Sequence, residues 1–291
     1  MKSTDNPTIP NQKFDKYYFK KQTRQFLLTL VNCLFWLFIT FPLIYAVLLS
    51  LKSPNEIYDP NSFLFPQNPT LSNYFDVFRM IPLGHFMLNS LIVASLITFS
   101  QILNAYLASF SFRFYNFKYK KLLYLWIIST TIIPGETVII SKYLMVSSWN
   151  LSDTLVALII PSLIGASDIF FCTQSMEKFP YEIYESAKID GCSDLKFIWS
   201  ILFPMMKPTT GVMAVRSFLA GWNMYMWPLL ITNSSDSRPV QVGISMLNNV
   251  ESQSLVLMIA GVIISMIPSL FIFILGRKSM IKGLTAGAVK G

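Results

Sequence analysis

Charged side chains are scarce in this sequence of 291 residues, because Asp, Glu, Lys and Arg together make up only 13% of it. Soluble domains carry about 25% charged residues, so about half of the usual polar surface is missing. The hydrophobic fraction is 53% and the aromatic fraction is 15%. A soluble globule of this size could not bury so much apolar surface, and a disordered chain would not contain it. The composition therefore excludes an ordinary cytosolic enzyme.

Residues that bind metals or catalyse hydrolysis are also few. The chain has one histidine, His85, and three cysteines. It contains no His-Glu-x-x-His pattern, no Cys-x-x-Cys pair and no cluster of carboxylates, so we expect no catalytic residue and no metal site. The dipeptide Gly-Lys is absent, which excludes the phosphate-binding loop Gly-x-x-x-x-Gly-Lys-Ser/Thr. We expect no cofactor on this chain, and any active transport must draw on an ion gradient or on a separate ATPase chain.

Long runs without charge divide the chain into lengths that fit a membrane. Residues 25–51, 80–112 and 252–276 contain no Lys, Arg, Asp or Glu, and three further runs contain only one or two. About 20 residues of helix cross the hydrocarbon core of a bilayer. The first run begins too late and is too long for a cleaved signal peptide. The pattern predicts an all-α, polytopic membrane protein with six transmembrane helices, near residues 26–49, 87–110, 122–144, 154–175, 209–232 and 255–276.

Lysine and arginine gather in alternate loops. If the N-terminus is cytoplasmic, 18 of the 23 basic residues lie on the cytoplasmic side, in an N-terminal arm (residues 1–25), the second-to-third loop, the fourth-to-fifth loop and the C-terminal tail. Because cytoplasmic loops carry the excess of Lys and Arg, we expect a multi-pass protein of the cell membrane, in contact with lipid, with both termini cytoplasmic. The net charge of +8 then reflects orientation and not nucleic-acid binding.

The fourth-to-fifth loop, residues 176–207, carries the most specific pattern. Pro180 suits the start of a helix and Gly191 suits the end of one, so we expect a helix, a turn and a second helix, with one helix along the membrane surface. Glu185-Ser-Ala, three residues, Gly191, nine residues and Ile201-Leu-Phe-Pro resemble the "EAA" loop of ABC importer permeases. That loop runs Glu-Ala-Ala, three residues, Gly, nine residues and Ile-x-Leu-Pro. Every spacing agrees.

Other segments extend this resemblance over the whole chain. The tail at residues 283–291 is similar to that of the smaller, maltose-type sugar permease, as are Pro134-Gly-Glu, Gly221-Trp-Asn and Trp227-Pro-Leu-Leu. Residues 222–228 also resemble glycerol-3-phosphate permeases. The resemblance implies the type I ABC importer permease fold, with a transmembrane permease domain at residues 26–282 that includes the loop at 176–207.

What the resemblance implies about function is specific. The chain would form half of the translocation pathway for a sugar or oligosaccharide and would not itself be an enzyme. Its partners would be a second homologous permease, two ATPase subunits that bind ATP and magnesium, and an extracellular solute-binding protein. An alternative is the same architecture importing glycerol-3-phosphate or a related polyol phosphate. An ion-coupled secondary transporter is less well supported, because we find no internal repeat.

Two segments are candidate contacts with the ATPases. In the loop, small residues would let a short helix enter a partner's cleft, Gly191 would permit positive φ, and Glu185 would form an ion pair or a helix cap. An amphipathic hairpin without a partner is the alternative. The tail would contact the ATPase pair, or it is a frayed end. The loop candidates are Glu185, Ser186, Ala187, Gly191, Ile201 and Pro204, and those in the tail are Gly287, Ala288, Val289, Lys290 and Gly291.

Four residues in the spans are candidates for the translocation path. An aromatic face at Trp222 and an amide at Asn223 suit a sugar, and core packing is the equal alternative. Arg216 would contact an anionic solute, pair with Asp168 or extend its side chain to the interface. Glu136 follows a Pro-Gly kink, where a structural or gating role is the stronger expectation.

Overall fold

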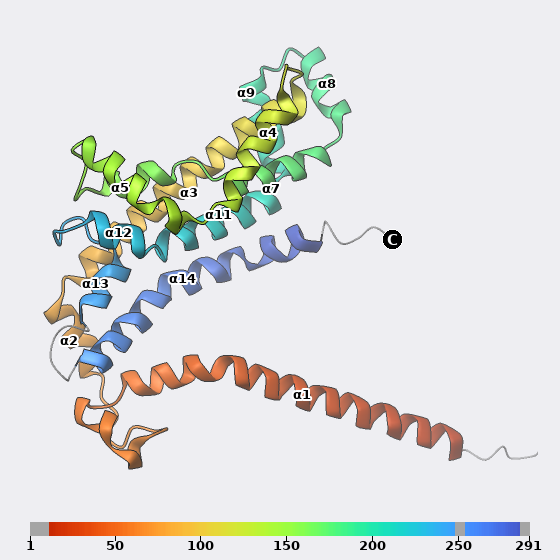
Figure 1. Ribbon diagram of the computed structural model, residues 1–291. Coiled ribbons are helices and arrows are strands. Elements are labelled where there is room, and N and C mark those ends of the chain that lie inside the picture. The colour runs from red at the N-terminus through yellow and green to blue at the C-terminus, as the bar shows by residue number, and fades with distance from the viewer. Residues whose placement is uncertain (1–11, 248–253, 286–291) are drawn as a thin grey trace, which may run out of the picture.

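The computed structural model describes residues 12–247 and 254–285. Within these ranges the regular structure is helical and no strand occurs, which confirms the all-α prediction. Figure 1 shows a long bundle of α3, α7, α11 and α14, with α1 beside it and set apart from most of it. The helices α8 and α9 lie at one end of this bundle, and α2 and α13 lie at the other.

Three helices are long and apolar enough to cross a bilayer without interruption. They are α1 (Gln12–Ser50), α3 (Leu83–Phe114) and α14 (Ser254–Thr285), with apolar segments at Arg24–Ser50, Leu83–Phe114 and Leu255–Ile281. These segments contain the first, second and sixth predicted spans. The helix α1 also continues into the predicted N-terminal arm, because it begins at Gln12.

The third and fourth predicted spans are broken helices. In the third, α4 (Lys120–Ser129) and α5 (Ile139–Ser148) are joined by short 3-10 turns, and the two halves meet at 93°. Pro134 stands at this break, as its inability to continue a helix requires. In the fourth, α6 (Leu155–Ile159) and α7 (Ala166–Glu177) meet at 43°. By length and composition, the described residues thus hold three candidate spans, or five if each bent pair is one span.

The fifth predicted span, residues 209–232, is not one helix. The helix α11 (Lys207–Trp222) ends before α12 (Met226–Ile231) begins. Pro228 in the first turn of α12 explains the break, because its ring would clash with the carbonyl group four residues earlier if the helix were continuous. Pro228 is tolerated there because the first N–H groups of a helix have no intrahelical partner.

The helix α3 is the axis of the bundle. It packs against α7 and α11, and α14 lies against α11 and touches α1. Gly221 permits a close approach of α11 to α3, since a Cβ atom at this position would lie 2.9 Å from the Ala94 Cα. Close helix contacts through small residues are a common means of association in membranes. The bundle therefore places the short helices at its two ends on one continuous support.

Candidate functional site

The loop at residues 176–207 folds as a helix, a turn and a second helix, as predicted. It contains α8 (Tyr181–Ile189) and α9 (Asp194–Phe197), followed by a π-helical segment (Ile198–Leu202) and α10 (Phe203–Met205). The Ser193 hydroxyl caps α9 by accepting the N–H of Lys196 at 3.4 Å. The wide π turn ends at Leu202, two residues before Pro204, which has no N–H to continue the α-helical ladder.

Gly191 closes α8 through a Schellman motif. Its φ is +75°, its N–H donates to the Lys188 carbonyl at 3.0 Å, and the Cys192 N–H donates to the Ala187 carbonyl at 2.9 Å. This pair of bonds satisfies carbonyl groups that the end of a helix leaves unpaired. A Cβ atom at Gly191 would meet nothing within 4 Å. Within this chain, the glycine is therefore required by its backbone conformation and not by crowding.

An aromatic cluster fastens this loop to the end of α3. The Tyr184 ring of α8 lies 4.4 Å from that of Phe114 and 5.1 Å from that of Phe197, and Phe110 lies 4.9 Å from Phe114. All four side chains are buried. Tilted and edge-to-face pairs of this kind add to the free energy gained from burial of apolar surface. The cluster joins α3, α8 and α9 into one rigid unit.

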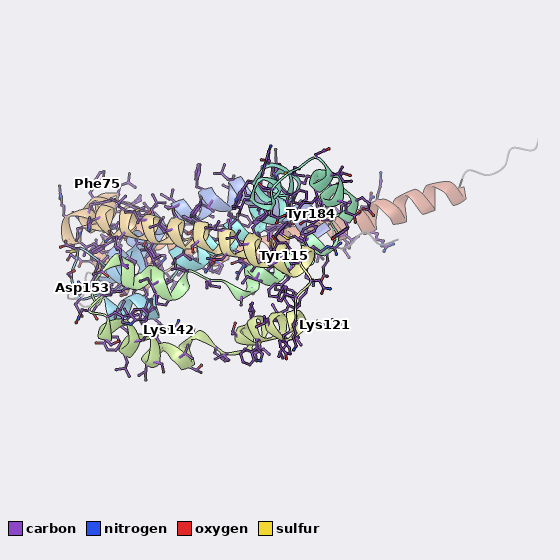
Figure 2. The ribbon with its side chains drawn as sticks, turned by 90° about the horizontal axis from the view of Figure 1, so that it is seen from above. Phe75, Tyr115, Lys121, Lys142, Asp153 and Tyr184 are labelled. Carbon is purple, nitrogen blue, oxygen red and sulfur yellow. The ribbon has the colours of Figure 1, made fainter. Side chains whose placement is uncertain are left out.

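Arg113 holds the segment that leads into the loop. Its guanidinium donates to the carbonyl oxygens of Met176 at 3.2 Å and Phe179 at 3.4 Å. The same group lies 5.6 Å from the centre of the Tyr181 ring. Unpaired carbonyls at a helix C-terminus attract cations, so Arg113 ties the end of α7 to the end of α3. In Figure 2, Tyr184 and Tyr115 lie close to this end of the bundle.

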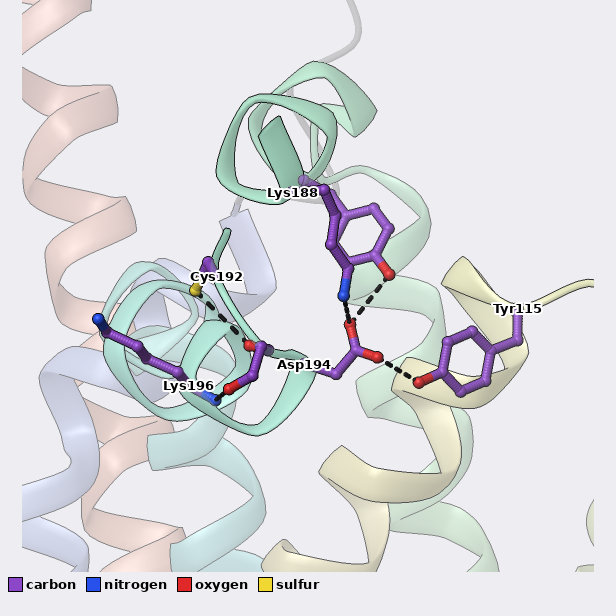
Figure 3. Close-up of polar contacts among 7 residues, drawn as sticks. Tyr115, Lys188, Cys192, Asp194 and Lys196 are labelled. Carbon is purple, nitrogen blue, oxygen red and sulfur yellow. Dashed lines mark hydrogen bonds and ion pairs between the residues drawn. The ribbon is translucent and has the colours of Figure 1, made fainter. Parts of the chain in front are cut away.

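Asp194 is the polar centre of the loop (Figure 3). Its carboxylate accepts hydrogen bonds from the Tyr115 hydroxyl at 2.5 Å and the Tyr184 hydroxyl at 3.0 Å, and it pairs with the Lys188 ammonium at 2.7 Å. These partners come from α8 and from the residue that follows α3. The first residue of α9 is thereby bound to both neighbouring elements.

These contacts shift the pKa values of the groups involved. Burial raises the pKa of Asp194, but the bonds from Lys188, Tyr115 and Tyr184 outweigh it and leave that pKa below its usual value. The bond to Asp194 raises the pKa of Lys188. Burial, followed by the bond to Asp194, raises the pKa of Tyr184 to about 12. The ion pair is therefore fully charged and both hydroxyls are protonated near neutral pH.

The predicted loop residues divide between the two faces of the hairpin. Glu185, Ser186 and Gly191 are exposed, as are the apolar side chains of Ile189, at 86%, and Leu195. Ala187 is instead buried in the core cluster that contains the four aromatic rings. Its small size serves packing inside this chain, which differs from the expectation that it enters a partner's cleft.

The last two predicted loop residues lie on the second helical segment. Ile201 is half-buried and packs on the same core cluster, and Pro204 is exposed. Asp194, Tyr115 and Tyr184 were not predicted as site residues. Tyr115 is 79 positions from Asp194, so no local spacing pattern reveals their contact.

A second feature is a hollow of about 380 Å³ where the three broken spans meet. Gly135 and Glu136 come from the break in the third span, Ser162 from the fourth, and the Asn223–Tyr225 break from the fifth. Lys142 and Trp227 complete one wall, with the Lys142 ammonium 5.9 Å from the Trp227 ring centre. Figure 2 shows the segment that carries Lys121 and Lys142 bowed away from the main bundle.

Side chains of α3 satisfy the backbone where the fourth span breaks. The Gln101 amide donates to the Ser162 carbonyl at 2.8 Å, and the Ser100 hydroxyl donates to the Leu163 carbonyl at 2.9 Å. The Asn104 amide also reaches the Leu163 carbonyl, at 3.3 Å. Irregular backbone at membrane depth persists only where such partners exist or where it lines a cavity. Both conditions hold at this break.

The four candidates for the translocation path do not lie together. Glu136 and Asn223 line the hollow, and the Asn223 oxygen accepts a bond from Gln241 at 3.3 Å. Trp222 is buried against α14, where its indole N–H donates to the Ser265 carbonyl at 3.1 Å. It is a packing residue in this conformation.

Arg216 is paired with Asp168, one of the roles considered for it. Its guanidinium lies 2.7 Å from the carboxylate, which also accepts a bond from the Ser217 hydroxyl at 3.0 Å. The Asp168 side chain is fully buried, whereas that of Arg216 is 40% exposed. The charge of Arg216 is thus neutralised within the chain.

The remaining predictions concern the tail, metals and His85. The tail candidates at residues 287–291 lie outside the described residues. Among those that the structure describes, no three His, Cys, Asp or Glu side chains form a group suited to a metal ion. His85 is exposed, and its Nε2 lies 3.2 Å from the Asp236 carbonyl oxygen.

Residues 101–278 match the family described as binding-protein-dependent transport system inner membrane component. The chain belongs to this family and is an ABC transporter permease.

Similar proteins extend over nearly the whole chain. It is 27% identical to the arabinooligosaccharides transport system permease protein AraQ of Halalkalibacterium halodurans, over 86% of this chain and 91% of that protein. It is 31% identical to a putative ABC transporter permease of Caldicellulosiruptor sp., with the same coverage. It is 27% identical to the sn-glycerol-3-phosphate permease UgpE of Agrobacterium fabrum, over 84% and 90%.

A solved structure shows the same fold. It is described as a bacterial ABC transporter involved in the import of the acidic polysaccharide alginate. The superposition has a TM-score of 0.79 at 17% identity and covers 94% of this chain and all of the matched chain. The expected importer permease fold is confirmed.

Proposed function

We propose that this chain forms half of the translocation pathway of an importer. It would pair with a second homologous permease and receive solute from an extracellular solute-binding protein. Two ATPase subunits, which hold ATP and magnesium, would supply the free energy. The observation that carries the proposal is the preformed hairpin, which exposes Glu185, Ile189 and Leu195 while its other face is bonded to α3. An exposed apolar side chain as large as Ile189 suits a partner surface.

The contacts of the loop suggest how force would pass to the membrane. When the ATPase pair closes on ATP, the hairpin would move with it. The aromatic cluster and Asp194 would carry that motion to α3, and Arg113 would carry it to α7. These helices support the breaks at the hollow, so the hollow would change its access from one side of the membrane to the other. Rigid connection matters here, because packed elements transmit small shifts without deforming.

We further propose that the α8–α9 end faces the cytoplasm, as do both termini. Support comes from the basic residues at this end, since the excess of Lys and Arg marks cytoplasmic loops. Cysteines at Asn68 and Ser235, at the opposite end, should react with an impermeant thiol reagent on intact cells. Cysteines at Asn116 and Lys178 should react only after permeabilisation. Labelling of the second pair on intact cells would contradict this orientation.

The proposed solute is a neutral sugar or oligosaccharide. The hollow presents a carboxylate (Glu136), amide and phenol groups (Asn223, Tyr225) and the Trp227 ring, which suit hydroxyl groups and the apolar face of a sugar. An anion such as glycerol-3-phosphate remains the alternative, because some relatives are named as arabinooligosaccharide permeases and others as glycerol-3-phosphate permeases. The pairing of Arg216 with Asp168 leaves no free arginine at that position for a phosphate. The lining of the hollow carries one acid, Glu136, and one base, Lys142, so it has no net positive charge, which favours the sugar.

Transport by the reconstituted complex tests this proposal. Vesicles that contain the chain with its co-expressed subunits and binding protein should accumulate a labelled arabinooligosaccharide when ATP is supplied. Asn223→Ala should reduce that uptake, whereas Ser235→Ala, at an exposed residue that does not line the hollow, should not. Uptake of glycerol-3-phosphate in place of the sugar would establish the alternative. ATP-dependent uptake of neither solute would leave the sugar proposal without support.

A further inference from the structure

The segment that follows α1, residues 51–71, folds on itself around a buried ammonium group. The Lys52 side chain is only 2% exposed. Its ammonium donates to the carbonyl oxygens of Ser62 and, at 3.2 Å, Phe63. A buried charge is costly unless it is hydrogen-bonded, so these bonds fix the position of the Ser62–Phe63 backbone.

The opposite side of the same loop is closed by a carboxylate. The two oxygens of Glu56 accept the N–H groups of Gln67 and Asn68, each at 3.1 Å. At the base of the loop, the Thr70 N–H donates to the Leu51 carbonyl at 2.8 Å. The loop is therefore rigid, and many of its polar groups are satisfied from within.

The tip of this loop, Phe63–Phe65, is apolar and uncovered. Phe63 and Phe65 are 69% and 68% exposed, and Leu64 between them is also exposed. A loop in water normally shows polar side chains and buries apolar ones. In this loop two of the three charged side chains, Lys52 and Glu56, are buried, whereas three large apolar side chains at the tip are exposed.

The loop tip lies beside the first span and not beyond it. The Tyr45 hydroxyl of α1 donates to the Phe63 carbonyl at 3.2 Å, and the two rings are 6.3 Å apart. On the other side of Tyr45, the Phe41 ring stacks at 5.9 Å. Tyr45 precedes the end of α1 at Ser50 by about 7.5 Å, at 1.5 Å per residue. Figure 1 shows the chain after α1 turning back alongside the end of that helix.

We propose that the loop tip is an interfacial membrane anchor, with Phe63, Leu64 and Phe65 inserted into the lipid leaflet at the Ser50 end of α1. Three observations agree on lipid as the occupant. The ladder Phe41–Tyr45–Phe63 continues the apolar surface of the span onto the loop, at the level where membrane proteins concentrate aromatic rings. The tip shows no charged side chain. At the start of the tip, the Phe63 carbonyl oxygen accepts bonds from Lys52 and Tyr45, so this polar group is satisfied by the chain itself, as contact with hydrocarbon requires.

The anchor has a definite mechanical effect. A helix in a bilayer is free to tilt and to shift along the membrane normal unless anchors at its ends oppose this. Because the loop is rigid and bonded to Tyr45, insertion of the tip fixes the depth and tilt of α1. Asn73 extends this restraint to α2 (Ser72–Met80) by donating to the carbonyls of Ser50 and Lys52, at 2.8 Å each.

Collision measurements on a spin label test this anchor. Phe65→Cys would be made in a chain that carries Cys33→Ser and Cys192→Ser, with Cys172 retained because it is buried. The full chain, with the subunits that co-purify with it, would be placed in lipid nanodiscs. Oxygen, which partitions into lipid, and a water-soluble nickel chelate serve as the two relaxants. The matched control is Asn68→Cys, which is exposed on the same loop.

The expected result is an oxygen-to-nickel collision ratio several-fold higher at position 65 than at position 68. Leu64→Cys gives a second measurement of the tip, with the same expectation. Frequent nickel collisions at 64 and 65 would place the tip in water and overturn the proposal. Few collisions with either reagent would show that protein covers the tip, such as a second permease, and would overturn it equally.

Discussion

The Lys188 ammonium lies 2.7 Å from the Asp194 carboxylate, so that one ion pair spans the turn between α8 and α9. The turn itself needs no charge to form, because the Schellman motif at Gly191 already closes α8. What the pair adds is a fixed distance between the two short helices. Two tyrosine hydroxyls extend this restraint from α8 to the end of α3.

We predict that Asp194→Asn weakens coupling more than it weakens folding. An amide keeps the size of the side chain but loses the charge that binds Lys188 and both tyrosines strongly. ATP-driven uptake by the reconstituted complex should fall several-fold, with only a small change in thermal unfolding, because the Lys188 and Asp194 side chains are 40% and 28% exposed and water screens their attraction. Asp190→Asn, an exposed acid in the same turn, is the control and should have no effect. Equal uptake by the two variants would contradict a coupling role for Asp194.

The contribution of this pair to stability should depend on pH only at the extremes. The pKa of Asp194 is below its ordinary value of 3.8, so its stabilisation is present above that value and is lost as the pH falls through the lowered pKa. The pKa of Lys188 is above 10.5, so its stabilisation is present below that value and is lost as the pH rises through the raised pKa. The difference in unfolding temperature between the native chain and Asp194→Asn should be constant from about pH 5 to about pH 9. A change inside this range would mean that another group titrates with the pair.

Substitutions at Gly191 should separate backbone strain from contact with a partner. Positive φ costs most residues about 1–2 kcal/mol, and β-branched side chains tolerate it least. Gly191→Val should therefore destabilise the loop more than Gly191→Asn, since asparagine adopts this conformation readily. No atom of this chain obstructs either side chain. If retention of the ATPase subunits on purification is lost equally in both variants, exclusion from a partner's cleft is the cause; loss in the valine variant alone identifies strain.

Charge reversal at Glu185 should loosen the ATPase subunits. Glu185 is exposed, and its side chain has no hydrogen bond or ion pair within the described residues, so Glu185→Lys should leave the permease folded and inserted. Against a basic partner surface it would replace attraction by repulsion. Glu182→Lys, one turn earlier on the same exposed side of α8, is the matched control. The salt concentration that strips the ATPases from purified complexes should fall for Glu185→Lys and stay unchanged for the control.

The Arg216–Asp168 pair should respond unequally to the loss of either partner. Arg216→Met leaves a fully buried carboxylate with one hydroxyl partner, and removal of one member of a buried pair costs about 3–5 kcal/mol. Asp168→Asn leaves a cation that is 40% exposed and can extend toward water. Thermal unfolding in detergent should therefore show Arg216→Met as the less stable variant. The opposite order would mean that the carboxylate is not the buried member of the pair in the assembled protein.

The sequence patterns predicted features that depend on neighbouring residues. Uncharged runs located the long helices, Pro134 located one break, and Gly191 located the positive φ at the end of α8. The breaks near Gly165 and Asn223 were not predicted. The fourth span breaks at Pro161, which has no N–H to continue α6, and Gly165 then begins α7 at a point where a Cβ atom would lie 2.6 Å from the Asp168 carboxylate and 3.1 Å from the Gln101 side chain. The break at Asn223 is caused by Pro228. Its ring would clash with the carbonyl group four residues earlier in a continuous helix, so α11 ends several residues before the proline.

Long-range contacts explain the remaining differences at the candidate site. Ala187 matches the sequence pattern of the loop, yet the pattern does not say whether a small residue packs inward or outward. Asp194 is one acid among several in the loop, and only the fold brings Tyr115 to it. Trp222 is suited by type to stack on a sugar, but it stacks on Phe218 instead, at 5.9 Å between ring centres. The type of a residue indicates which interactions its side chain can make, and the fold around it decides which of those interactions it does make.

The preformed hairpin has a consequence for how such an importer assembles. Its shape is completed by the aromatic rings, the Asp194 bonds and the Schellman motif, all of which belong to this one chain. A partner that docks on an ordered surface immobilises few additional groups, so the entropy lost on association is small. If the hairpin is the joint with the ATPases, as proposed, assembly would require neither solute nor nucleotide to shape it, and the free energy of each ATP would be left for moving the hairpin as a rigid body.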